Sequence, residues 1–221
     1  SIAAKYIRRF LGADEYLYNT PRFCLWLKDS TGQERASSPV LKKRIADVKS
    51  MRLASTKKPT QALADVAYLF GEIRQTNNPY VLIPLHTSED RKYIPFGFMD
   101  SSVICGNANS MLPNATLLEF GLISSRMHMA WVAAVCGRIK SDFRYSSTIV
   151  YNNYPFPTIT TEKIKADIES CALAVVKERE AEDARCAKEN VHSSMAAMYG
   201  VGNMPESLLK AHIALDKAVD K

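Results

Sequence analysis

The spacing of hydrophobic residues varies along the first 160 residues, where both strand and helix patterns occur. Short apolar runs bounded by polar residues, glycine or proline predict strands at 23–27, 80–84, 93–98 and 102–105. Alternation over 138–151 predicts one longer strand, which the proline-containing segment 152–157 ends. Helical spacing predicts helices at 60–73 and 114–135. This part of the chain is therefore expected to mix α and β structure.

Another helix is predicted to begin at Ser38 and Pro39. The Ser38 side chain can cap a helix, and proline is tolerated at the first helical position. Leu41, Ile45 and Val48 follow at the spacing of one helix face, which predicts a buried stripe. The lysines of this helix lie away from the stripe and are expected to face solvent: Lys42, Lys43 and Lys49.

After residue 160 the pattern is helical. Thr160 or Thr161 can cap a helix, and its predicted buried stripe contains Ile164, Ile168, Ala172, Val175 and Val176. Pro205 begins a last helix, and its predicted buried face contains Leu208, Ala211, Leu215 and Val219. The expected fold class is α+β: a mixed domain with short strands and long helices over 1–159, then a small all-α C-terminal subdomain over 160–221.

Charge is unevenly distributed along the chain, whose net charge is +6. Residues 1–160 carry a net charge of +8, and residues 161–221 a net charge of −2. Within the first part, Arg35–Lys58 holds eight Lys and Arg against one acid, Asp47. Such a segment attracts a polyanion such as nucleic acid, and it is equally compatible with a solvated helix face. An acidic membrane surface fits less well, because no large aromatic or leucine face accompanies the charge.

Composition excludes several protein classes. Apolar residues make up 47% and charged residues 24% of the chain, which excludes disordered and collagen-like chains. No apolar run of about 18 residues could span a membrane. Five cysteines without a C-x-x-C pair argue against structural zinc and a disulfide framework, and they indicate a reducing, intracellular compartment. Ser1–Lys5 resembles neither a translation start nor a signal peptide, so a piece of a longer protein is expected.

Catalytic motifs are missing from the sequence. No glycine-rich loop follows a strand, no G-x-S-x-G elbow occurs, and no cysteine has a convincing histidine partner. Asn77-Asn78-Pro79-Tyr80 partly resembles the D/N/S-P-P-Y/F loop with which amino-methyltransferases hold the target amino group. Asn78 stands where that loop has proline, and an apolar strand follows, so a turn into a strand is the preferred interpretation. We therefore expect no catalytic residue, metal ion or cofactor in this chain.

A family resemblance arises from five segments in order between residues 79 and 157. They read PYVLIP (79–84), SEDRKYIP (88–95), FGLISSRMHMAW (120–131), GRIKSDFRYS (137–146) and IVYNNYPFP (149–157). This succession resembles the target recognition domain of MmeI-like type IIL restriction-modification enzymes. The segments MPESLLKAH (204–212) and LDKAVD (215–220) are similar to the last domain of that family.

The resemblance implies that this chain is the sequence-reading, non-catalytic segment of a bacterial cytoplasmic enzyme. Such enzymes join an endonuclease, a helical connector, an adenine-N6 DNA methyltransferase, the recognition domain and a helical C-terminal domain in one chain. The implied partners are double-stranded DNA and the methyltransferase domain of the same chain, and no membrane. S-adenosylmethionine, and Mg²⁺ for cleavage, would bind the other domains. Whether the parent enzyme also cuts DNA stays open.

The candidate base-reading residues are Lys140, Asp142 and Arg144, which would point to one face of an extended strand, with Phe143 anchoring the other face. Lysine or arginine can donate to guanine O6 and N7, and aspartate can accept from cytosine N4. From the residues alone, an exposed ion ladder is the preferred interpretation. The resemblance reverses that preference. It implies one specificity pair of Lys140 with Asp142, and another of Arg144 with a residue near Ala108.

Further basic residues are expected to contact phosphates, which position a protein on DNA without reading its sequence. They are Lys42, Lys43, Arg44, Lys49, Lys57, Lys58, Arg91 and Arg138. His128 and Trp131 are expected in the core. Three alternatives stay open: a methylation-only homologue, a helical protein-interaction module with its basic face on an acidic partner, and an enzyme that acts through residues 77–80.

Overall fold

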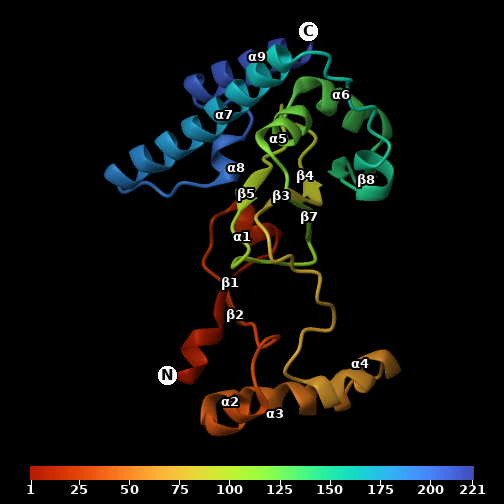
Figure 1. Cartoon of the computed structure of the whole chain (residues 1–221). Coiled ribbons are helices and arrows are strands. Elements are labelled where there is room, and N and C mark those ends of the chain that lie inside the picture. The colour runs from red at the N-terminus through yellow and green to blue at the C-terminus, as the bar shows by residue number, and fades with distance from the viewer. The chain divides into compact units, whose positions relative to one another are not determined.

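The computed structural model describes all residues from Ser1 to Lys221, and they form two compact units that are described separately (Figure 1). Unit 1 consists of Ser1–Phe10, Arg22–Gln75 and Ser102–Ile104. Unit 2 consists of Leu11–Pro21, Thr76–Ser101 and Cys105–Lys221. None of the helices combines the length and the apolar character that crossing a membrane requires.

Unit 1 combines short helices with most of a three-stranded sheet in the order β2-β1-β6. Its elements are the 3-10 turns η1 (Ile2–Tyr6) and η2 (Leu63–Val66), the strands β1 (Ile7–Leu11), β2 (Phe23–Leu25) and β6 (Ile104–Cys105), and the helices α2 (Gly32–Ser37), α3 (Pro39–Leu53) and α4 (Lys58–Ala62). The predicted strand at 23–27 is confirmed over its first three residues.

Helix α3 begins where its sequence predicts. The Ser38 hydroxyl accepts a hydrogen bond from the Leu41 amide, and Pro39 is the first helical residue. Leu41 is fully buried, while Ile45 and Val48 are half-buried, so the predicted stripe is confirmed. The lysines of the helix are exposed, also as predicted: Lys42, Lys43 and Lys49.

Unit 2 contains two antiparallel three-stranded sheets. The first has the order β5-β3-β7, with β5 at Gly97–Met99, β3 at Tyr80–Pro84 and β7 at Asn109–Pro113. Every residue of the central strand β3 is buried, which confirms the strand predicted there. The second sheet has the order β4-β9-β8, with β4 at His86–Thr87, β9 at Asp142–Arg144 and β8 at Gly137–Ile139.

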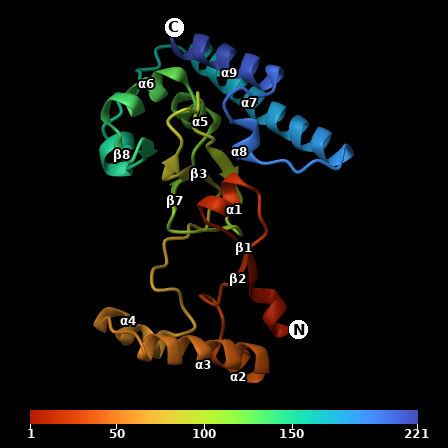
Figure 2. The ribbon, with the colours of Figure 1, turned by 180° about the vertical axis from the view of Figure 1, so that it is seen from behind.

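The helices of unit 2 are α1 (Ala13–Leu17), α5 (Leu117–Ile123), α6 (Arg126–Val135), α7 (Glu162–Lys188), α8 (Met195–Met198) and α9 (Glu206–Val219), together with the π-helical turn η3 (Ser147–Tyr151). Helices α7 and α9 lie side by side in both views (Figure 1, Figure 2). Gly121 of α5 allows α7 to approach closely, because a Cβ at that position would lie 2.9 Å from Ile168 Cγ2.

The core of unit 2 draws on both halves of the sequence. Val81 and Phe120 are buried in one cluster with Ile168 of α7 and Leu215 of α9. The predicted buried faces of both late helices are confirmed. The two compact units therefore do not coincide with the expected segments 1–159 and 160–221. Helices α7 and α9 belong to unit 2, because they complete the core of residues that precede them in the chain.

Buried polar groups cross this core. Tyr93 donates to Asp216 Oδ2 at 2.7 Å, and the Arg126 amide donates to Asp216 Oδ1 at 2.7 Å. His128 is fully buried, as expected, with its Nε2 3.0 Å from the Tyr145 hydroxyl. Burial lowers the pKa of His128 from 6.5 to about 4.

Several predicted elements are wrong in extent. Of the strands expected at 93–98 and 102–105, the structure forms β5 from Gly97 to Met99 and β6 over Ile104–Cys105. The helix expected over 114–135 is two helices, α5 and α6. The Ser125 side chain accepts a hydrogen bond from the His128 amide and so caps the start of α6. The helix expected over 60–73 ends with η2 at Val66. The strand expected over 138–151 is a short hairpin followed by η3, because the chain reverses at Lys140 and Ser141.

Candidate functional site

The hairpin β8–β9 carries the residues expected to read bases, but it arranges them differently from one extended strand. Lys140 lies in the two-residue turn with φ of 56°, a left-handed conformation that is uncommon for residues other than glycine. It therefore does not continue the row of Asp142 and Arg144. The expectation of three side chains on one strand face is wrong for Lys140, which lies exposed at the hairpin tip.

Asp142 and Arg144 do share the exposed face of β9. Phe143 between them is 4% exposed and pairs with Thr87 of β4, which is 3% exposed, so this face of the strand is buried. The prediction that Phe143 anchors the strand is confirmed. Arg144 pairs with both His86 of β4 and Gly137 of β8. The open face of the sheet thus presents a carboxylate and a guanidinium on a backbone held by two neighbouring strands.

Arg138 and Glu89 brace the hairpin from its other side. The Arg138 guanidinium donates to Glu89 Oε2 at 2.7 Å and to the carbonyl of Ser141 in the turn at 2.7 Å. It also lies over the ring of Phe143, 4.3 Å from the centroid. The Glu89 amide in turn donates to Asp142 Oδ1 at 3.4 Å. The side chain of Arg138 therefore has internal partners on three sides.

Ala108 lies near the end of β9, because Leu85 forms backbone hydrogen bonds with both Ala108 and Tyr145. The Leu85 amide donates to the carbonyl of Ala108 at 3.2 Å, and the Leu85 carbonyl accepts from the Tyr145 amide at 2.8 Å. Ala108 is half-buried, while the flanking Asn107 is exposed. Asn109 on the other side is 6% exposed and donates to the carbonyl of Leu11 at 2.9 Å. Of the three, Asn107 is the most accessible polar side chain.

The basic residues of α3 and α4 form a separate exposed set in unit 1. Lys57 immediately precedes α4, Lys58 is the first residue of that helix, and both are exposed, as are Lys42 and Arg44 of α3. Two lysines have exposed acidic partners: Lys43 lies 3.3 Å from Asp47, and Lys49 lies 3.4 Å from Asp65. Exposed pairs of this kind contribute little and leave the positive field largely in place.

Charge differs strongly between the two units. Unit 1 carries 14 Lys and Arg against five Asp and Glu, a net charge of +9, which leaves −3 for unit 2. Eight of these 14 basic residues are not among the expected site residues, and three of the eight belong to one β-ribbon, namely Arg8, Arg9 and Arg22. Pairing of β1 with β2 brings them together, since Arg8 is opposite Cys24 and Arg9 is opposite Phe23. Long-range strand pairing of this kind leaves no local signal in the sequence.

Arg91, also expected to contact phosphate, is half-buried in unit 2. Its Nη1 donates to the hydroxyl of Thr87 at 3.0 Å, so it supports β4 from below the exposed face. Burial lowers the pKa of the Arg91 guanidinium. The chain gathers no group of three or more His, Cys, Asp and Glu side chains that could hold a metal ion.

Comparisons with known proteins agree over nearly the whole chain. The family model described as the MmeI target recognition domain matches residues 1–158, and the model described as the MmeI C-terminal domain matches residues 160–221. DNA methyltransferase A of Bacillus subtilis (strain 168) is 34% identical over 216 residues, which is 98% of this chain and 23% of that protein.

A solved structure gives a further match. It is that of the type IIL restriction-modification enzyme MmeI in complex with DNA, with a TM-score of 0.88 and 42% sequence identity. The match covers 99% of this chain and 28% of that chain. This chain therefore spans about a quarter of the length of either relative.

Proposed function

The chain belongs to the MmeI family, whose target recognition and C-terminal domains it carries, and on that premise we propose that it recognises a specific sequence in double-stranded DNA. The observation that carries the proposal is the exposed face of the hairpin. Asp142 and Arg144 project from one side of β9, Lys140 lies at the tip, and Phe143 fixes the strand from behind. A two-stranded ribbon fits the major groove, where base edges are distinguishable.

The proposed reading assigns one base pair to Lys140 and Asp142. The Lys140 ammonium donates to guanine O6 and N7, and the Asp142 carboxylate accepts from N4 of the paired cytosine. Arg144 reads a second position together with the segment around Ala108, where the exposed Asn107 is the alternative contact. Each correct contact discriminates against a wrong base pair by about 1–3 kcal/mol.

Phosphate contacts are assigned to the exposed basic residues of unit 1. They are Lys42, Lys43, Arg44, Lys49, Lys57 and Lys58, and the net charge of +9 of their unit supports this role. Arg91 and Arg138 were expected to share it. The internal contacts of their guanidinium groups favour a different role, in which both stabilise the sheet β4-β9-β8 that carries the hairpin.

The proposed parent is a longer DNA adenine-N6 methyltransferase, since the relatives are about four times as long as this chain. In it, residues 1–159 would read DNA and 160–221 would form the C-terminal helical domain against that reading part. The partners are duplex DNA and the methyltransferase domain of the same polypeptide, in the bacterial cytoplasm. S-adenosylmethionine, which supplies the methyl group, and Mg²⁺, in a parent that also cuts DNA, are assigned to the domains outside this chain.

Titration of the chain with duplex DNA at several salt concentrations tests the proposed function. Binding that weakens linearly with the logarithm of salt concentration, and prefers one sequence selected from a randomised duplex pool, supports it. Absence of any salt-sensitive DNA binding would instead favour an acidic protein partner for the basic face, and it would overturn the proposal.

A further inference from the structure

Phe23 is an exposed aromatic residue on a β-strand of unit 1. Its exposed fraction is 64%, higher than that of any other phenylalanine in the chain. Contiguous exposed apolar surface rimmed by polar residues marks a contact surface, and Ile7 and Val40 are also exposed beside Phe23 along one groove. Phe23 lies directly opposite Arg9 in the antiparallel pair β1–β2, so their side chains leave the same face of the ribbon side by side.

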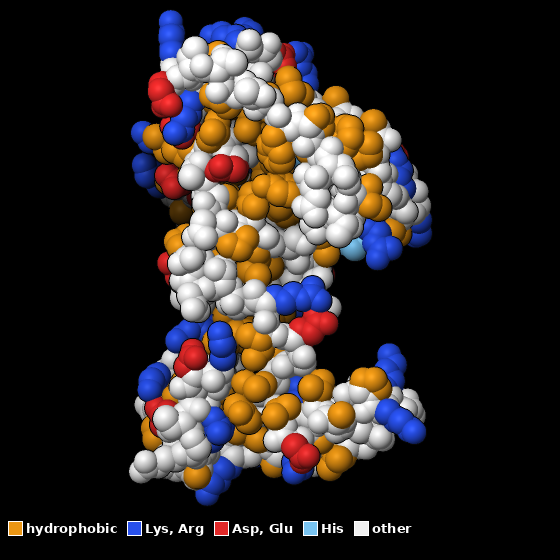
Figure 3. Space-filling view, turned by 45° about the vertical axis from the view of Figure 1, so that its right-hand side comes forward, with side chains coloured by type: hydrophobic (Ala, Val, Ile, Leu, Met, Phe, Trp, Pro, Cys, Tyr) orange, Lys and Arg blue, Asp and Glu red, His pale blue; other side chains and the backbone are white.

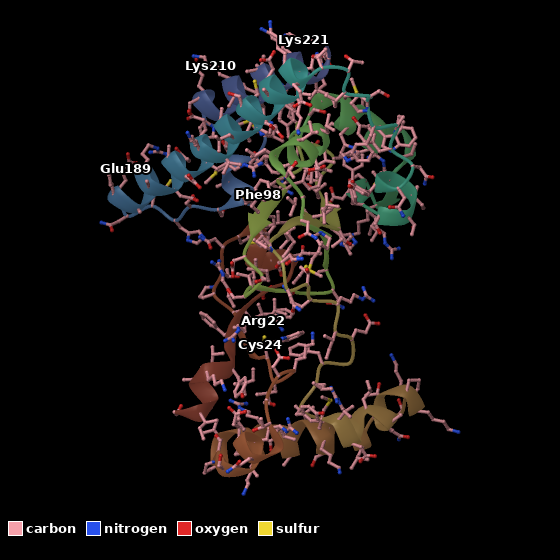
Figure 4. All side chains as sticks on the ribbon, viewed as in Figure 1. Arg22, Cys24, Phe98, Glu189, Lys210 and Lys221 are labelled. Atoms are coloured by element: carbon pink, nitrogen blue, oxygen red, sulfur yellow. The ribbon has the colours of Figure 1, made fainter.

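Two more arginines belong to this ribbon. Arg8 is opposite Cys24, and the backbone of Phe10 donates to the carbonyl of Arg22, which continues the ladder by one residue. The Arg22 guanidinium lies over the ring of Phe10, 4.9 Å from its centroid. Figure 4 labels Arg22 and Cys24 close together on this part of the ribbon. Arg8, Phe10 and Arg22 thus share the face of the ribbon opposite to that of Phe23, and Arg9 is the arginine that flanks the exposed ring.

Aromatic packing holds the ribbon from its other face. Phe10 stacks on Phe70 with centroids 6.2 Å apart, and Trp26 lies 5.3 Å from the same ring. The Phe23 face itself lines an apolar groove of about 640 Å³ together with Ile7 and Leu25. In Figure 3, hydrophobic side chains gather on this unit with Lys and Arg side chains around them.

The charge of unit 1 decides which occupant fits this surface. A net charge of +9 favours a polyanion. Duplex DNA is a polyanion with an apolar interior of stacked bases, so it complements the positive charge of unit 1, with Arg9 beside the ring, as well as the exposed ring itself. Proteins that bend DNA insert apolar wedges, phenylalanine among them, between base steps, while neighbouring basic residues hold the phosphates.

We propose that the β1–β2 ribbon is a second DNA-contacting surface, in which Phe23 inserts into the base stack and Arg9 holds an adjacent phosphate. The inference rests on the proposed function and adds to it a deformation of the DNA at a site apart from the reading hairpin. Insertion unstacks one base step and bends the duplex.

The experiment uses the full chain and a duplex that carries its selected sequence, with a donor and an acceptor dye at the two ends. Energy transfer reports bending, and 2-aminopurine, placed at each step in turn, reports unstacking. We expect binding to raise both signals in the wild-type chain. Phe23→Ala should abolish the unstacking signal and weaken binding about tenfold. Phe23→Leu, which keeps an apolar wedge, should retain part of the signal. Arg9→Ala should reduce the salt slope by about one unit.

Val201→Ala is the matched control, because Val201 is 70% exposed and belongs to unit 2. It should behave as wild type, and thermal melting verifies that every variant is folded. Wild-type bending and affinity in Phe23→Ala would overturn the inference while leaving the proposed function intact. A chain dimer that Phe23→Ala dissociates would overturn it too, because the surface would then join two copies of the chain. Absence of salt-sensitive DNA binding in the wild type would overturn both proposals.

Discussion

Arg138 and Glu89 form an ion pair of 2.7 Å that connects strand β8 with the loop after β4. The same guanidinium holds the carbonyl of Ser141 inside the turn. Because Asp142 also accepts from the Glu89 amide, one loop constrains both sides of the hairpin tip. The hairpin is thus braced by contacts that leave Lys140 and Asp142 exposed.

Loss of this brace should affect base preference more than affinity. Arg138→Ala and Glu89→Ala are each expected to relax the preference at the base pair assigned to Lys140 and Asp142, because a loosened turn aims its side chains less well. The measurement is selection from a randomised duplex pool. The salt slope of binding should stay unchanged. If it falls by about one unit in Arg138→Ala alone, Arg138 is a phosphate contact instead.

The exposed lysines of α3 should act on all sequences alike. Lys42→Ala with Lys43→Ala is expected to reduce the salt slope of DNA binding by about two units without altering the selected motif, because phosphate contacts carry no sequence information. Lys210→Ala is the control, since Lys210 is exposed on α9 and pairs with Glu206. An altered motif in the double variant would mean that α3 reads bases.

Gly121 should be essential for the packing of α5 on α7. In Gly121→Ala the new Cβ meets Ile168 Cγ2 at 2.9 Å and Ala172 Cβ at 3.2 Å, so the helices must separate. We expect the free energy of unfolding to fall by about 1–3 kcal/mol, measured by denaturant titration. Gly137→Ala is the control, because its nearest neighbour would be the Arg144 carbonyl at 3.9 Å. Equal stability of the two variants would contradict the close approach of the helices.

The buried His128 should lower the free energy of unfolding of the chain at acid pH. The pKa of His128 is about 4 in the folded chain and 6.5 in the unfolded chain, so the unfolded state binds the proton first as pH falls. Stability is expected to be constant above pH 6.5 and to fall towards pH 4, by about 3 kcal/mol from His128. Burial lowers the pKa of His212 in the same direction.

Urea unfolding of wild type and His128→Gln from pH 7 to pH 4 measures this contribution as a difference between the two proteins. The difference should shrink with falling pH, whereas His192→Gln, at an exposed position, should follow the wild type. A pH-independent difference would contradict the burial of a neutral His128.

The sequence predicts those elements whose signals are local. The apolar run of β3 and the helical face of α9 identify both, and Ser38 with Pro39 identifies the start of α3. The turn at Lys140 contains no glycine or Asn-Gly pair that would signal a hairpin, so the alternation across it predicts one continuous strand. Local sequence patterns cannot show which residues far apart in the sequence lie side by side in the fold. Arg9 beside Phe23 and Ala108 near β9 are two examples.

The family resemblance supplied what periodicity could not. By themselves, Lys140, Asp142 and Arg144 favour an exposed ion ladder over a base-reading surface. The order of five segments around them indicated a recognition domain, and the matching family models confirm that family. The roles of the individual residues stay predictions, because they depend on contacts with bases.

Exchange of the two charges at the hairpin tests the central claim most directly. Lys140→Glu and Asp142→Arg are introduced together, and the preferred sequence is selected from a randomised duplex pool beside that of the wild type. The proposed reading predicts that one position switches from G·C to C·G while the rest of the motif is kept. An unchanged motif, bound with wild-type affinity, would contradict it.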